Sequence, residues 1–124
     1  MLLTNFYTIK QIQSSTESDS WNVRIELNPE HAVYAGHFPG HPVVPGVCLL
    51  QIIKESIENI RKESLLYAQI GSCKFLSVVN PLETSELLFT LTLKEGEEGK
   101  CQLRAEGTSG QECFIKLKAT LTQK

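Results

Sequence analysis

The sequence predicts an α+β fold in which an antiparallel sheet of about six strands packs on one central helix. Several segments alternate apolar and polar residues with period two, which is typical of half-buried strands. One segment repeats apolar residues at helical spacing. The strand-like segments after it follow one another closely, and this short spacing favours antiparallel pairing.

Two strands are expected before the helix. The first covers about residues 6–12, and the second places Trp21, Val23, Ile25 and Leu27 at alternate positions. Residues 13–20 are polar and rich in serine. We interpret them as a solvated hairpin loop, because each flanking strand needs a partner.

The one expected helix covers about residues 47–62. Its apolar residues fall on one face at roughly 100° per residue and should lie on the sheet. They are Leu49, Leu50, Ile53, Ile57 and Ile60. The first turn is apolar nearly all round, whereas the later turns carry charged side chains. We therefore expect the N-terminal half of the helix to be buried on more than one side.

The strands after the helix are expected at about residues 68–79, 87–93, 101–105 and 113–121. Asn80-Pro81 stops the first of them, and turns at 95–99 and 108–110 separate the others. We find no internal repeat and no sign of a second domain, so residues 1–124 are expected to form a single domain.

Charge and hydropathy exclude several functional classes. The formal net charge is −2 and the basic residues are scattered along the sequence, which argues against nucleic-acid binding. No apolar run approaches the roughly 18 residues of a membrane-spanning helix. Residues 1–3 lack the basic flank and the apolar length of a signal peptide. A soluble, cytoplasmic protein without a membrane partner is expected.

The cysteines and histidines do not predict a metal site. Cys48, Cys73, Cys101 and Cys113 are widely separated, so reduced thiols are expected. Cys101 and Cys113 fall on apolar strand positions and should pack in the core. For Cys48 the helix dipole could lower the thiol pKa, but packing is the favoured role. His31 and His41 are expected to be solvated loop residues.

Residues 36–47 carry the strongest functional signal. They read Gly-His-Phe-Pro-Gly-His-Pro-Val-Val-Pro-Gly-Val, with proline at every third position. Each proline fixes φ near roughly −65° and restrains the residue before it, so this segment should be stiff and should hold His37 in place. Pro45-Gly46 leads into a helix N-terminus, where unpaired N–H groups can receive developing negative charge. A base and an oxyanion site could therefore share one segment.

This motif resembles the signature of the FabZ/FabA-type 3-hydroxyacyl-acyl-carrier-protein dehydratases, and the resemblance covers about residues 23–121. It implies the hotdog fold, in which the sheet wraps around the helix. It also implies dehydration of a 3-hydroxyacyl thioester on acyl carrier protein to the trans-2-enoyl thioester, in fatty-acid or polyketide/polyene-type synthesis. No cofactor is expected.

By this resemblance, His37 matches the catalytic histidine that removes the Cα proton, and the amides of Gly46 and Val47 match the oxyanion region. The alternative for His37 is a hydrogen bond within a turn. Where the family carries Glu or Asp, this chain has Gln51, which cannot supply a proton. Gln51 could still hold the hydroxyl or a water, or it could belong to a solvated polar face. Glu55 could replace the missing acid only if the substrate bound differently.

The resemblance also implies an active site at a dimer interface. The histidine of one subunit would face the helix residue of the other, so we expect a homodimer or a heterodimer with an acid-bearing relative. Two other functions remain open, namely a hotdog acyl thioesterase and a weakly active or non-catalytic subunit. Lys54, Arg61 and Lys74 could attract an acidic carrier protein, but nothing in the sequence brings them together. Leu82-Glu83 replaces the family's Gly-Asp, which leaves the geometry of that turn open.

Overall fold

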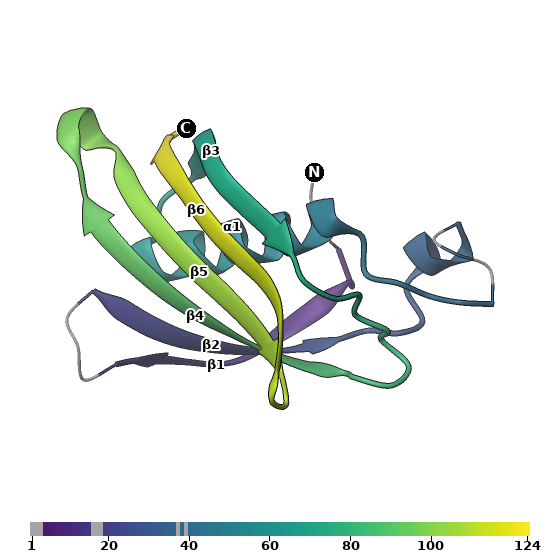
Figure 1. Cartoon of the computed structure of the whole chain (residues 1–124). Helices are drawn as coiled ribbons and strands as arrows, with labels where there is room; N and C mark the ends of the chain where they lie inside the picture. The colour runs from purple at the N-terminus through teal and green to yellow at the C-terminus, as the bar shows by residue number, and fades with distance from the viewer. Residues whose placement is uncertain (1–3, 16–18, 37, 39) are drawn as a thin grey trace.

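The computed structural model describes residues 4–15, 19–36, 38 and 40–124. Among these residues, a six-stranded antiparallel sheet curves around one long helix, as Figure 1 shows. The elements in chain order are β1 (Tyr7–Ser14), β2 (Ser20–Leu27), the 3₁₀ helix η1 (Ala32–Ala35), α1 (Gly46–Arg61), β3 (Leu65–Phe75), β4 (Glu86–Glu95), the 3₁₀ turn η2 (Glu97–Gly99), β5 (Cys101–Ser109) and β6 (Glu112–Gln123). The order across the sheet is β1-β2-β4-β5-β6-β3, so β1 and β3 form its edges. The predicted α+β hotdog architecture is confirmed.

The helix packs on the concave face of the sheet through one side. Its buried residues are Cys48, Leu49, Ile52, Ile53, Ser56 and Ile57. This confirms the predicted stripe at its centre, whereas Leu50 and Ile60 are only partly buried. The expectation that the N-terminal half of the helix is buried on more than one side is wrong at Val47, whose side chain is 67% exposed.

The central strands follow the period-two pattern of a sheet with one buried face. On β4, alternate residues from Leu87 to Leu93 are buried and those between them are exposed. The pattern fails at the start of β6, where Phe114 and Ile115 are both buried and Cys113 is only half-buried. A register shift at Gly107 accompanies this change. A Cβ at Gly107 would lie 2.6 Å from the Phe114 ring, so only glycine leaves room for that ring.

The edge strand β3 begins at Leu65 and ends at Phe75, earlier at both ends than the expected 68–79. It pairs with β6, and two register shifts interrupt that pairing. Along it, Leu66, Ile70 and Phe75 are 44%, 43% and 52% exposed. The expected strand was placed too late because residues 76–79 are also mostly apolar, although they form the loop that follows β3.

Asn80 closes the turn that contains Leu82 and Glu83. Its side-chain Oδ1 accepts a hydrogen bond from the Leu82 amide at 2.9 Å, and its carbonyl accepts from the Glu83 amide at 3.1 Å. An asparagine that bonds the backbone two residues further on favours a turn without glycine. Among the described residues, no helix is long and apolar enough to cross a membrane.

Candidate functional site

The site begins at η1, which His31 caps. The Nδ1 atom of His31 accepts a hydrogen bond from the Val33 amide at 3.0 Å, so the proton is on Nε2, which donates to the Thr4 carbonyl at 3.0 Å. The imidazole also meets the Phe6 ring edge-on, with centroids 5.1 Å apart. His31 lies in a loop, as expected, but it is half-buried and hydrogen-bonded through both ring nitrogens rather than fully solvated. His41 is exposed, as expected.

The proline-rich segment continues from Gly36, which ends η1. His37 and Pro39 lie outside the described residues, so the predicted base remains a prediction from the motif. Phe38 and His41 bond to each other through both backbones, at 3.2 and 2.9 Å. Gly40 lies between them with φ of +78°, a conformation that glycine adopts without strain.

The last residues of this segment lead directly into α1. The Val44 amide donates to the Val79 carbonyl at 2.9 Å, which ties the segment to the loop after β3. Pro45 is the N-cap residue, and no side chain caps the helix. The amides of Gly46 and Val47 follow directly, and the amides of a first helical turn have no acceptor within the helix. The positive end of the helix dipole lies at these two amides, which can therefore bind a negatively charged oxygen.

Exposed apolar side chains lie at the helix start and in the chain that follows β3. The Phe75 ring lies over Gly46, so that a Cβ at position 46 would be 2.8 Å from the ring. We name Val47, Phe75, Leu76 and Val78 the apolar rim; they are 67%, 52%, 50% and 73% exposed. This concentration of exposed apolar surface beside polar amides is typical of a binding or interface region.

Cys48, in the first turn of α1, and Tyr34, in η1, are both buried. Burial raises the pKa of the Cys48 thiol, so it stays protonated and packs in the core, as favoured from the sequence. Burial also raises the pKa of Tyr34, so its hydroxyl stays protonated. The Tyr34 hydroxyl is buried and has no hydrogen-bond partner in the described part of the chain.

Gln51 is held by Glu55. The Gln51 Nε2 atom donates to Glu55 Oε2 at 2.8 Å, and the Tyr7 hydroxyl donates to Glu55 Oε1 at 2.6 Å. Burial raises the pKa of Tyr7, and its hydrogen bond to Glu55 raises it further, so this hydroxyl stays a donor. A carboxylate only accepts, so the amide nitrogen of Gln51 faces Glu55 and Oε1 is turned away from it. Both Glu55 oxygens are occupied, which makes this residue a poor substitute for the missing acid.

The other polar residues of α1 bind the ends of strands. Lys54 and Glu58 pair at 3.6 Å, and they bond the Leu65 carbonyl and amide at 3.1 and 2.7 Å, which anchors the start of β3. Arg61 pairs with Glu95 at 2.6 Å. Lys54 and Arg61 therefore do not form a common basic surface with Lys74, which lies on β3. No group of three or more His, Cys, Asp or Glu side chains within the described ranges could hold a metal ion.

Comparison with known proteins shows the family. The model of the ApeI-like family, described as ApeI dehydratase, matches residues 12–116. The chain belongs to the ApeI-like dehydratase family. It is also 30% identical over 96 residues to the 3-hydroxyacyl-[acyl-carrier-protein] dehydratase FabZ of Chloroflexus aggregans, covering 72% of this chain and 67% of that protein.

Two further similarities extend this result. The FabZ of Latilactobacillus sakei is 32% identical over 75 residues, and the match covers 55% of this chain and 54% of that relative, about half its length. The dehydratase heterocomplex ApeI:P from Xenorhabdus doucetiae has a chain with a TM-score of 0.75 at 18% identity, covering 93% of this chain and 96% of that one. At 18% identity this similarity shows the fold alone, and the two chains share that fold along nearly their whole length.

In this ApeI-like chain the fold places Gly46, Val47 and Gln51 on one helix. Gln51 follows the helix start by about one and a half turns, or about 7 Å along the axis. Sequence reasoning missed Tyr7 and Tyr34. Tyr7 lies in an alternating strand segment, and nothing in that pattern indicates that its hydroxyl reaches a carboxylate on the helix 48 residues later in sequence.

Proposed function

We propose that this chain removes water from a 3-hydroxyacyl thioester carried by acyl carrier protein and releases the trans-2-enoyl thioester, in fatty-acid or polyene-type synthesis. The observation that carries this proposal is the uncapped start of α1, which follows the proline-rich segment directly. Membership of the ApeI-like dehydratase family supports it. The motif supplies His37, and the helix start supplies two amides for the thioester carbonyl.

The proposed reaction begins at the Cα proton of the substrate. His37 takes this proton, and the electron pair moves to the thioester carbonyl oxygen, which becomes an enolate oxygen. The amides of Gly46 and Val47 donate to this oxygen, and one such donor is typically worth about 10²- to 10³-fold in rate. The carbonyl then re-forms, the Cα–Cβ double bond appears and the Cβ–O bond breaks. His37 returns its proton to the departing hydroxyl, which leaves as water.

Gln51 has a positioning part in this proposal. Its Oε1 atom and its second N–H remain available when Glu55 holds the first N–H, so the amide can bind the substrate hydroxyl. It has no ionisable proton to give, and His37 must therefore act both as base and as acid. A missing positioned acid typically lowers a rate by about 10²- to 10⁴-fold, so we expect slow catalysis by this chain alone.

A second subunit would complete the proposed site. The apolar rim and the exposed edge of β3 are surfaces that a second hotdog subunit could cover. A homodimer would carry Gln51 in both sites. A heterodimer with an acid-bearing relative would combine His37 of this chain with the relative's acid in one site and would leave the reciprocal site weak.

The direct test offers the purified chain a 3-hydroxyacyl thioester on carrier protein and separates the products by mass spectrometry. An enoyl thioester is expected. Free thiol would indicate a thioesterase instead, and binding without either product would indicate a non-catalytic subunit. His37→Ala should abolish elimination, whereas the matched control His41→Ala, which changes an exposed imidazole nearby, should not. An unchanged rate in the His37 variant would remove the mechanism.

The heterodimer is tested separately by purifying the tagged chain from its native cell. Recovery of a second hotdog subunit with Glu or Asp at the position of Gln51 is the expected result, together with faster elimination by the pair than by either subunit alone. Recovery of only the self-paired chain counts against the heterodimer and leaves the reaction itself untouched.

A further inference from the structure

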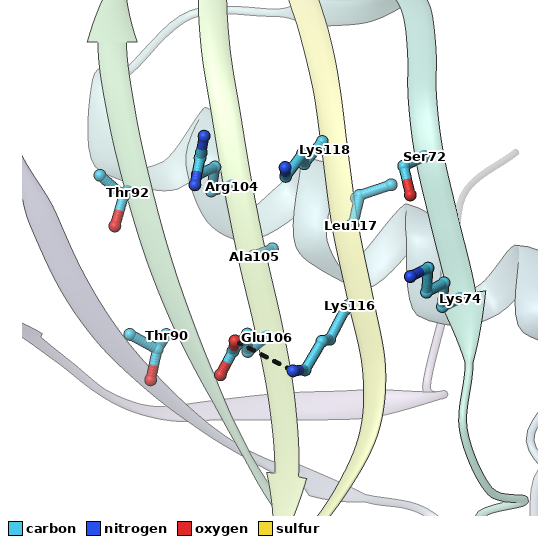
Figure 2. A pocket seen from close by; sticks show the side chains of 10 residues that line it. All are labelled: Ser72, Lys74, Thr90, Thr92, Arg104, Ala105, Glu106, Lys116, Leu117 and Lys118. Atoms are coloured by element: carbon cyan, nitrogen blue, oxygen red, sulfur yellow. Dashed lines mark ion pairs between the residues drawn. The ribbon is translucent and has the colours of Figure 1, made fainter.

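The outer face of the sheet, opposite α1, carries a cluster of basic side chains. We name Lys74 of β3, Arg104 of β5, and Lys116 and Lys118 of β6 the basic face. They surround an open hollow of about 460 Å³. Figure 2 shows these side chains together on the strands, with the helix behind the sheet. Glu106 is the one acidic residue among those lining the hollow, and it pairs with Lys116 at 4.0 Å.

The register of the strands places like charges directly opposite each other. Lys74 is the cross-strand partner of Lys116, and Arg104 is the partner of Lys118. Like charges at opposite positions on adjacent strands destabilise a sheet. Two such pairs on one face, with a single carboxylate to offset them, cost folding stability. A bound anionic partner would relieve this repulsion.

The basic face also stands out against the charge of the whole chain. The chain has 12 basic and 14 acidic residues, so removing the four basic residues and Glu106 leaves eight basic against thirteen acidic. The face is thus positive on a molecule that is otherwise negative. Such a separation steers a partner of opposite charge to one face and repels it from the others.

We propose that the basic face is a docking surface for the acidic surface of the carrier protein, an inference that rests on the proposed function. The hollow spans four strands, and Ser72 adds a hydroxyl group that can donate to a carboxylate. Lys74 precedes Phe75, whose ring lies over Gly46, so the face ends one residue from the contact with the helix start. A carrier docked there is close to the proposed site.

A protein partner fits this surface better than a nucleic acid or a lipid membrane. The negative charge of the rest of the chain repels an extended polyanion such as duplex DNA. The polar lining offers no large exposed apolar side chain that could insert into a bilayer. A compact acidic protein can meet the basic face alone and avoid the negative surfaces.

The test measures binding of recombinant holo acyl carrier protein by calorimetry at low and at physiological salt. Arg104→Glu replaces a like-charge pair with an opposite-charge pair facing Lys118, so this variant should be slightly more stable to heat than the wild type. It should nevertheless bind the carrier at least about tenfold more weakly. Misfolding cannot explain weaker binding by a more stable protein. Lys10→Glu, an equal charge change on β1 at the other edge of the sheet, should bind like the wild type.

Activity separates this inference from the proposed function. Arg104→Glu should lower kcat/KM for a carrier-linked substrate at least about tenfold and leave it unchanged for the same acyl group on free pantetheine. If the variant binds the carrier as tightly as the wild type, or if duplex DNA or anionic vesicles bind the basic face more tightly than the carrier does, the docking surface is refuted. If the wild type binds the carrier through this face but turns over neither substrate, the proposed function fails and the docking surface stands.

Discussion

The Gln51 amide nitrogen lies 2.8 Å from Glu55 Oε2, so the residue at the family's acidic position is held by a carboxylate one turn further along α1. This contact determines the result of Gln51→Glu. Two carboxylates at that separation cannot both ionise easily, so the pair keeps one proton and its pKa rises above that of an ordinary glutamate. The variant therefore gains a proton donor near neutral pH, and we expect elimination to be about 10-fold faster or more.

The stability of Gln51→Glu should depend on pH. The folded variant binds more protons than the unfolded chain near neutral pH, so its free energy of unfolding falls as pH rises through the raised pKa of the pair. Urea unfolding at several pH values measures this. In the double variant Gln51→Glu, Glu55→Gln the new carboxylate accepts from an amide, so both the pH dependence and the rate gain should shrink. A gain of equal size in the double variant would show that Glu55 does not tune the new acid.

Tyr7→Phe should destabilise the protein by about 1 to 2 kcal/mol, because it removes a hydrogen bond to a charged group in a half-buried place. Tyr67→Phe is the matched control, since its hydroxyl donates to the neutral Leu50 carbonyl at 2.7 Å and should contribute about 0.5 to 1.5 kcal/mol. A double-mutant cycle of Tyr7→Phe with Glu55→Gln measures the coupling. Strict additivity would mean that Tyr7 does not support Glu55.

Gly46→Ala should slow elimination while changing the free energy of unfolding by no more than about 1 kcal/mol. The new methyl group would lie 2.8 Å from the Phe75 ring, and this ring is half-exposed and can move. As the methyl group and the ring move apart, the helix start also shifts, and the amides of Gly46 and Val47 lose their alignment with the thioester carbonyl. Adding Phe75→Ala should restore the rate. Gly71→Ala, which meets only the Lys118 carbonyl at 3.6 Å, should behave like the wild type.

Tyr34→Phe should leave the free energy of unfolding unchanged or raise it by about 1 kcal/mol, because the buried hydroxyl it removes has no partner among the described residues. Thermal and urea unfolding measure this directly. Phe keeps the ring packing against Phe6, whose centroid lies 5.7 Å away. A loss of more than about 1 kcal/mol would show that the hydroxyl has a partner in the folded chain.

The sequence predicted the elements that depend on local periodicity. The alternation of β4 and the central stripe of α1 are confirmed because burial on one face enforces them. The pattern of β6 failed at Cys113 because a register shift at Gly107 turns Phe114 inward. Periodicity carries no information about where a strand is displaced from its regular register.

The candidate site could be predicted only in part, because local patterns in the sequence do not show which distant segments meet. The motif indicated the helix start at Gly46, since proline and glycine act on their own backbone. The bond from His31 Nε2 to the Thr4 carbonyl and the bond from Tyr7 to Glu55 depend on segments far apart in sequence. The exposure of Val47 depends on where the sheet ends, which no local pattern encodes.

The place of β3 in the sheet has a consequence for folding. Leu65 pairs with Gln123 and Phe75 with Ile115, so this strand finds its neighbour only after β4 and β5 have been synthesised. Contacts of such long range slow folding and leave apolar segments uncovered in the meantime. Until β6 has been synthesised, β3 lacks its neighbour in the sheet and its apolar side chains stay uncovered.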